Sequence, residues 1–287
     1  MKYCLSILPE IDRMLRGSQR VLIASDFDGT LCAIADTPSA VRVTPAMLEI
    51  LRRAAACPRI ELAVISGRAL ADVRRRVPLD IVFAGNHGLE IGGRGCDFEH
   101  AEAGRHRRHL EHACASLAQM MRPWPAAWIE DKGITATLHF RNVEQRQHHA
   151  LLFAARQAIG PDGTHLALRT GRRALEIRPK IAWDKGSALE HIRERTGPFD
   201  ACICLGDDRT DECMFRANAN QLNVRVGLSA GSAATHYLSE LNEVAILLSH
   251  IVDVCGPAAR APWVNALAAS AGAAPMAAAA PAAGDES

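Results

Sequence analysis

The sequence predicts an α/β fold, in which a parallel sheet carries helices on both faces and a second, smaller α/β module is inserted. Short apolar strands alternate with helical patterns over about the first hundred residues, and the same alternation resumes after about residue 180. Three of the early strands end in polar, glycine-rich turns. Because ligands bind beyond the carboxyl ends of the strands in such sheets, these turns indicate where a functional site lies.

The composition is that of an ordinary globular protein. The chain has 287 residues, of which 48% are hydrophobic and 23% charged, and a formal net charge of +1. This charge argues against a nucleic-acid-binding protein, which usually has a strong basic excess. Nine cysteines without the spacing of a disulfide framework or a zinc site indicate a reduced, cytoplasmic protein. No apolar stretch approaches the roughly 20 residues that span a bilayer, so we expect no membrane insertion.

The first part of the chain predicts three strands of the parallel sheet. An amphipathic helix is expected within residues 1–19, followed by a buried strand at 20–25 that ends at DFDGT. A helix at 45–56 leads to a second strand at 61–65, which ends at SGR. A third strand at 80–83 ends at AGNHG. Each of the three turns therefore lies at the carboxyl end of a strand.

The pattern changes after about residue 104. A helix is expected at 105–121 and another at 143–159, and each precedes a pair of strand-like runs, at 127–131 and 134–140 and then at 165–170 and 174–177. The parallel pattern resumes with a helix at 185–195 and a strand at 201–205 that ends at GDDRTDE. We therefore expect a core of residues 1–103 and 180–257, a cap of residues 104–179, and a disordered Ala/Pro-rich tail at 258–287.

Two carboxylates, Asp26 and Asp28, follow the first buried strand. A plain turn is one explanation, because Asp and Gly favour turns. A calcium-binding loop fits poorly, because Gly29 is fourth rather than sixth in the pattern and Thr37 stands at the twelfth position, where a glutamate is required. A carboxylate pair at the mouth of a sheet suits metal-assisted phosphoryl transfer better. One carboxylate can attack phosphorus and bind magnesium while the other protonates the leaving oxygen.

The motif DFDGTL, from Asp26 to Leu31, resembles the first motif of the haloacid dehalogenase (HAD) superfamily of phosphatases, DxDGT. That superfamily has a Rossmann-like parallel-sheet core with an inserted cap. The resemblance implies that Asp26 is the nucleophile and forms an aspartyl-phosphate. It also implies that Asp28 is the general acid and then the base, and that the Asp28 backbone carbonyl binds Mg²⁺.

Three later motifs also match that superfamily in order. Ser66 and Gly67 of VISGR offer neutral donors to the phosphoryl oxygens. Lys185 of WDKGSAL offers a cation that offsets the repulsion between a carboxylate and a phosphate dianion. GDDRTDE offers further carboxylates, of which Asp207 is the expected magnesium ligand and Asp208 and Asp211 are additional ones.

The cap is expected to select the substrate. Its segment WIEDKGITATLHFR resembles the cap of trehalose-6-phosphate phosphatases, in which an ExK pair precedes an aliphatic strand and a His-aromatic-Arg ending; ALEIRP and AGNHGLE also resemble that family. Taken singly, each polar residue here could be an exposed strand position or could shape a loop. The resemblance implies that sugar or phosphate contacts come from Glu130, Lys132 and Glu176, and further from Arg141, His87, Glu90 and Arg68.

By this resemblance the chain hydrolyses trehalose 6-phosphate to trehalose and phosphate, with Mg²⁺ and no organic cofactor. This is the second step of a two-step synthesis, so the functional partner would be the trehalose-6-phosphate synthase. Three alternatives stay open: a phosphatase of sucrose phosphate or glucosylglycerol phosphate, a magnesium-dependent mutase, and a silent regulatory domain that binds a sugar phosphate. A silent domain would be expected to have lost one of four residues that are all present here, Asp26, Asp28, Lys185 and Asp207.

Overall fold

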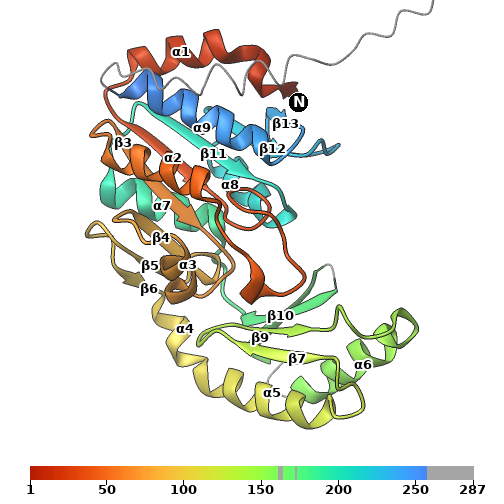
Figure 1. Cartoon of the computed structure of the whole chain (residues 1–287). Helices are drawn as coiled ribbons and strands as arrows, with labels where there is room; N and C mark the ends of the chain where they lie inside the picture. Colours follow the sequence, from red (N-terminus) through yellow and green to blue (C-terminus); the bar gives the residue numbers. More distant parts are fainter. Residues whose placement is uncertain (161–163, 172, 257–287) are drawn as a thin grey trace, which may run out of the picture.

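The computed structural model describes residues 1–160, 164–171 and 173–256 and contains a large and a small α/β body (Figure 1). Within these residues, the large sheet has nine strands in the order β1-β13-β12-β11-β2-β3-β4-β5-β6. All neighbours from β1 to β4 in this order are parallel, and β5 and β6 extend the sheet antiparallel. The predicted fold class is thereby confirmed. The predicted disordered tail, 258–287, lies outside the described residues.

The elements of the large body come from both ends of the chain. Its strands are β1 (Lys2–Tyr3), β2 (Val21–Ser25), β3 (Ile60–Ile65), β4 (Val82–Gly85), β5 (Glu90–Gly92), β6 (Phe98–Glu99), β11 (Ala201–Gly206), β12 (Leu222–Val226) and β13 (His236–Leu238). Its helices are α1 (Leu8–Gly17), α2 (Pro45–Ala56), α3 (Leu70–Arg76), α7 (Lys185–Thr196), α8 (Glu212–Ala217) and α9 (Asn242–Cys255).

Helices cover both faces of the large sheet. Along β2, Val21 and Ile23 belong to a core cluster with α1, α2 and α9. Leu22 and Ala24, which point to the other face, pack with residues of α7 and α8. A strand buried on both faces has no polar side to show, which is why this segment is continuously apolar.

The small body is a four-stranded antiparallel sheet with two main helices on one face. Its strand order is β7-β8-β10-β9, and Figure 1 shows this sheet between the large body and helices α5 and α6. Leu138, Leu175 and Ile177 form its apolar face and pack against those helices. The elements are α4 (Ala101–Arg105), α5 (Arg107–Met120), β7 (Trp128–Asp131), β8 (Ala136–His139), α6 (His148–Ile159), β9 (Leu166–Thr170) and β10 (Ala174–Pro179).

The opposite face of the small sheet is polar. Glu130 and Glu176 both lie opposite Thr137, on the strands that flank β8. Because side chains alternate between the two faces of a strand, these three residues share one face. That face turns toward the large body, because Glu176 contacts His87 and Lys132 contacts the backbone of Gly67.

Several elements differ from those that the sequence predicts. The helix expected over 105–121 is divided at His106, whose backbone (φ −90°, ψ 1°) leaves the helical region and separates α4 from α5. The helix expected over 143–159 begins only at His148, after a short 3₁₀ turn at Gln145–Gln147. The strands β5, β6 and β13 have only two or three residues, too few to show an alternating pattern. Among the described residues, no helix combines the length and the apolar character that crossing a membrane requires.

Leu138→Ala is expected to lower the free energy of unfolding of the small body by about 2–5 kcal/mol, because the Leu138 side chain is fully buried against α5 and α6. Urea denaturation followed by circular dichroism measures the change. Leu228→Ala is the matched control, because Leu228 is 72% exposed and its loss should change stability by less than about 0.5 kcal/mol. Equal stability of the two variants would contradict the packing described here.

Candidate active site

Three neighbouring strands deliver polar side chains to one edge of the large sheet. The strands β11, β2 and β3 are adjacent and parallel, so their carboxyl ends lie together. Asp207 follows β11, Asp26 follows β2 and Ser66 follows β3. The predicted juxtaposition of the polar turns is therefore present.

A cluster of carboxylates forms at this edge. Asp26, Asp207 and Asp211 each place one oxygen within 4.8 Å of the others. Lys185 Nζ donates to Oδ1 of Asp26 and to Oδ1 of Asp211, each at 2.6 Å. Three carboxylates against one ammonium group leave an excess of negative charge in a buried site.

The pKa values in the cluster reflect this charge balance. Burial raises the pKa of Asp26 well above its usual range, Lys185 opposes the shift, and Asp211 and Asp207 add to it. Burial, and then the charge of Asp211, raise the pKa of Asp207 to about 6. Burial alone would lower the pKa of Lys185, but Asp211 and Asp26 raise it, so the ammonium stays charged. The cluster as a whole favours the uptake of additional positive charge.

The donor set fits a divalent cation. Oδ1 of Asp207 is buried and has no hydrogen-bond partner among the described residues. Asp211 is held by the backbone N–H groups of Asp207 and Asp208, which donate to its Oδ2 at 3.0 and 2.9 Å. Carboxylate oxygens are ligands that Mg²⁺ prefers, and Asp26 and Asp207 could hold it.

Two glycines make room for these carboxylates. Gly29 has φ +83°, and a Cβ there would lie 2.3 Å from Oδ2 of Asp207. A Cβ on Gly206 would lie 2.5 Å from Cβ of Asp211. Glycine is therefore required in the DFDGT turn for two reasons. It adopts the positive φ, and it leaves space for the Asp207 carboxylate.

Asp28 and Asp208, which the sequence also predicts near the metal, lie outside the three-carboxylate cluster. The Asp208 side chain is exposed and caps the short 3₁₀ turn Arg209–Asp211. The Asp28 carboxylate accepts from Nε and Nη2 of Arg68 at 2.7 and 2.6 Å. The predicted role of the Asp28 backbone carbonyl concerns a different atom and stays a prediction.

The Arg68 side chain is buried and forms ion pairs with two carboxylates. The phosphate contact predicted for it stays a prediction. Besides Asp28, Arg68 pairs with Asp72 at 2.9 Å. Burial alone would lower the pKa of Arg68, but Asp28 and Asp72 raise it. Both oxygens of Asp28 thus accept from Arg68, and the predicted role of Asp28 as the general acid stays a prediction.

The turn after β3 contacts the small body. Ser66 is buried, and its Oγ accepts from the backbone N–H of Arg68 at 3.2 Å. Lys132 Nζ donates to the carbonyl of Gly67 at 3.0 Å. Lys132 therefore reaches from the β7–β8 turn of the cap to the turn that is predicted to bind phosphate.

The other predicted cap residues line the polar face. Glu130 contacts Nε2 of His139 at 2.8 Å. His87 Nε2 lies 2.6 Å from Oε1 of Glu176. Burial alone would raise the pKa of Glu176, but His87, Arg178 and Lys132 lower it to about 2, so this carboxylate is ionised. It can accept hydrogen bonds from hydroxyl groups.

Arg141 and Glu90 each form a hydrogen bond with a residue of the large body. Arg141 donates to Asp36 at 3.2 Å in the loop that follows the DFDGT turn. Glu90 accepts from Nδ2 of Asn86 at 2.6 Å and so holds the AGNHG turn. The substrate contacts predicted for both residues stay predictions.

Sequence reasoning missed a buried contact between the two bodies. Thr135 Oγ1 donates to Oδ1 of Asn86 at 2.6 Å, and Asn86 Nδ2 also donates to the carbonyl of Lys132 at 3.3 Å. Asn86 has φ +50°, a left-handed conformation that Asn tolerates better than most residues. That preference is the signal in AGNHG that could have identified Asn86.

A family model described as Trehalose-phosphatase matches residues 24–243. The chain belongs to the trehalose-phosphatase family. It is 38% identical over 198 residues to a trehalose-phosphate phosphatase of Mycobacterium tuberculosis, a match that covers 66% of this chain and 49% of that protein. It is 40% identical over 222 residues to an uncharacterized glycosyl hydrolase of the same species, covering 74% of this chain and 16% of that protein. The chain thus spans half or less of these two relatives.

The trehalose-phosphatase fold is also seen in solved structures. The C-terminal domain of Candida albicans trehalose-6-phosphate phosphatase superimposes with a TM-score of 0.69 at 21% identity, covering 85% of this chain and 96% of that one. This structural similarity shows that the two chains share a fold. The family predicted from the motifs is therefore confirmed, and the matched segment includes every predicted site residue from Asp26 to Asp208.

Gly29→Ala is expected to weaken divalent-metal binding by at least about tenfold, because the new Cβ displaces the Asp207 carboxylate. The affinity for Mn²⁺, measured by electron paramagnetic resonance, gives the effect without requiring turnover.

Gly95→Ala is the matched control for this substitution. Gly95 also has a positive φ, +74°, but a Cβ there meets no atom within 4 Å. Both variants should lose about 1 kcal/mol of stability through backbone strain, and only Gly29→Ala should lose Mn²⁺ affinity. The same Mn²⁺ affinity in both variants would contradict the assignment of Asp207 as a metal ligand.

Proposed function

We propose that this chain is a Mg²⁺-dependent phosphatase that hydrolyses trehalose 6-phosphate to trehalose and phosphate. The observation that carries the proposal is the cluster of Asp26, Lys185 and Asp207, at the edge of the large sheet where Lys132 of the cap contacts the turn after β3. Membership of the trehalose-phosphatase family supports the substrate. In this function the partner is the synthase that makes trehalose 6-phosphate.

In the first half of the reaction, a carboxylate oxygen of Asp26 attacks phosphorus and the bond from phosphorus to the sugar oxygen breaks. Asp28 gives a proton to that oxygen, and an aspartyl-phosphate remains on Asp26. In the second half, Asp28 takes a proton from water as the water attacks phosphorus, which releases phosphate and restores Asp26.

The neighbouring groups stabilise charge during both halves. Lys185 donates to Asp26 and so keeps a positive charge beside the entering phosphate. Ser66 Oγ and the Gly67 amide provide neutral donors for phosphoryl oxygens. Mg²⁺, when bound, adds positive charge that offsets the repulsion between the carboxylates and the phosphate.

The cap provides side chains that can form hydrogen bonds with the hydroxyl groups of a sugar. A disaccharide presents hydroxyl groups, which carboxylates accept from and ammonium groups donate to. Glu130, Glu176 and Lys132 project from one face of the cap sheet toward the large body. Sucrose phosphate and glucosylglycerol phosphate are the competing substrates, and they differ from trehalose 6-phosphate only in the part that this face would contact.

Phosphate release from a panel of sugar phosphates tests the proposal. We expect a strong preference for trehalose 6-phosphate over sucrose 6-phosphate and glucose 6-phosphate, and loss of activity when a chelator removes Mg²⁺. Asp26→Asn should lower the turnover by about a thousandfold or more, because it removes the nucleophile. Normal turnover in that variant would refute the mechanism, and equal use of all sugars would refute the substrate.

Lys132→Ala and Glu130→Gln are expected to lower kcat/KM for trehalose 6-phosphate by about tenfold or more, and to have a much smaller effect on an aryl phosphate. The reason is that an aryl phosphate lacks the hydroxyl groups that these side chains would bind. Glu144→Gln is the control, because Glu144 is an exposed cap residue paired with Arg146. Equal losses on both substrates would show that Glu130 and Lys132 do not recognise the sugar.

A further inference from the structure

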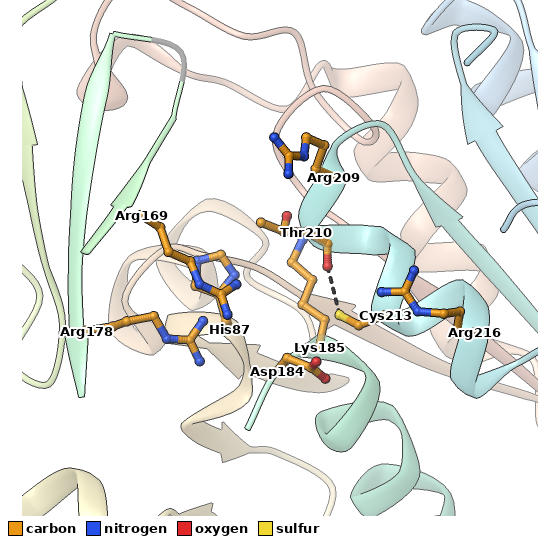
Figure 2. A pocket seen from close by; sticks show the side chains of 9 residues that line it. All are labelled: His87, Arg169, Arg178, Asp184, Lys185, Arg209, Thr210, Cys213 and Arg216. Carbon is orange, nitrogen blue, oxygen red and sulfur yellow. Dashed lines mark hydrogen bonds between the residues drawn. The ribbon is translucent and has the colours of Figure 1, made fainter. Parts of the chain in front are cut away.

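A cavity of about 160 Å³ lies beside the carboxylate cluster, where the cap meets α7 and α8 (Figure 2). Lys185 and His87 form the part of its wall that it shares with the predicted active site. The described residues that line the cavity do not include Asp26, the predicted nucleophile, or Ser66, which is predicted to bind phosphate. The cavity is therefore a neighbour of the phosphoryl site and not the same space.

Cations converge on this cavity from both bodies. Figure 2 shows Arg169 and Arg178, from the cap strands β9 and β10, facing Arg209 and Arg216, from the 3₁₀ turn before α8 and from α8 itself. Like charges gathered from two bodies repel each other across the space between them.

The carboxylates nearby offset only part of this charge. Glu176 lies opposite Arg169 in the cap sheet and attracts Arg178, but it leaves the other described arginines of the lining without a carboxylate close by. Asp184 is the one carboxylate in the lining, and its Oδ1 accepts from the backbone N–H groups of Gly186 and Ser187 at 2.9 and 3.1 Å. Asp184 therefore caps α7 instead of pairing with an arginine.

Among the described residues, none of the four arginines forms an ion pair with a carboxylate. Arg178 donates to the backbone carbonyl of Trp183, which carries no charge. Within residues 1–160, 164–171 and 173–256, Arg169, Arg209 and Arg216 form no ion pair. Elsewhere in the large body a half-buried arginine does pair, as Arg225 does with Glu212 at 3.1 Å. The unpaired arginines thus leave a positive field in the cavity.

We propose that this cavity is a second binding site, which takes a small free oxyanion of the phosphate or sulfate type and joins the cap to the large body through it. Guanidinium groups match tetrahedral oxyanions because they present pairs of parallel N–H donors. The cavity is smaller than the roughly 300–1,000 Å³ of sites for drug-sized ligands, so its size also favours a small ion. An anion here gives the arginines of both bodies a shared partner of opposite charge.

Sulfate titration of the metal-free full-length chain tests the site. Isothermal calorimetry is carried out with a chelator present and with chloride holding the ionic strength constant. We expect one binding event, which Arg169→Gln and Arg216→Gln each weaken by about tenfold, or about 1.4 kcal/mol, and which the double variant abolishes. Both side chains are exposed and without an ion pair, so an unchanged thermal midpoint without sulfate shows that the variants fold.

Two variants serve as controls. Arg146→Gln removes an exposed arginine that is paired with Glu144 and lies outside the cavity lining, so sulfate binding should stay as in the wild type. Ser66→Ala removes a donor of the phosphoryl site, and binding should again persist. Wild-type affinity in Arg169→Gln and Arg216→Gln, loss of binding in Ser66→Ala alone, or no sulfate binding by the wild type would each overturn the proposal. None of these results depends on turnover, so the proposed function is tested separately.

Discussion

A cluster of three carboxylates, two of which pair with one buried lysine, is the arrangement on which the rest of the structure depends. Removing charged groups from water costs several kcal/mol for each group unless partners compensate. Lys185 compensates part of this by donating to Asp26 and Asp211, and it stays in place because Asp184 caps α7 one residue earlier. The remaining negative charge favours a cation at this edge of the sheet, and in the proposed function that cation would also offset the charge of the phosphate.

The two bodies divide the chemistry between them. The large sheet is buried on both faces, so its strand ends are held rigidly enough to fix Asp26, Ser66 and Asp207 relative to one another. The cap sheet is apolar toward its own helices and polar toward the large body. In the proposed function, the large body would carry out the reaction and the polar face of the cap would discriminate among sugars. Lys132 joins the two bodies where it contacts Gly67.

Lys185 also separates two regions of opposite charge. On one side lie the carboxylates, and on the other lies the cavity to which four arginines contribute. Contacts such as that of Thr135 with Asn86 join the cap to the large body. An oxyanion bound in the cavity, as proposed, would add a contact between the two bodies, because arginines of both contribute to its lining.

The sequence by itself determined the family, the fold class and the residues that the site brings together at the strand ends. It could do so because buried strands, helix caps and the DFDGT turn are local patterns, and because parallel strands place their carboxyl ends at one edge. Only the tertiary structure decided which carboxylate joins the cluster: Asp211 rather than Asp208, since the turn after β11 directs Asp211 toward Lys185. The same holds for the pairing of Arg68 with Asp28 and for the arginines that meet in the cavity. Those contacts join residues 40 or more positions apart or on different bodies, and no local pattern records which distant charges will face each other.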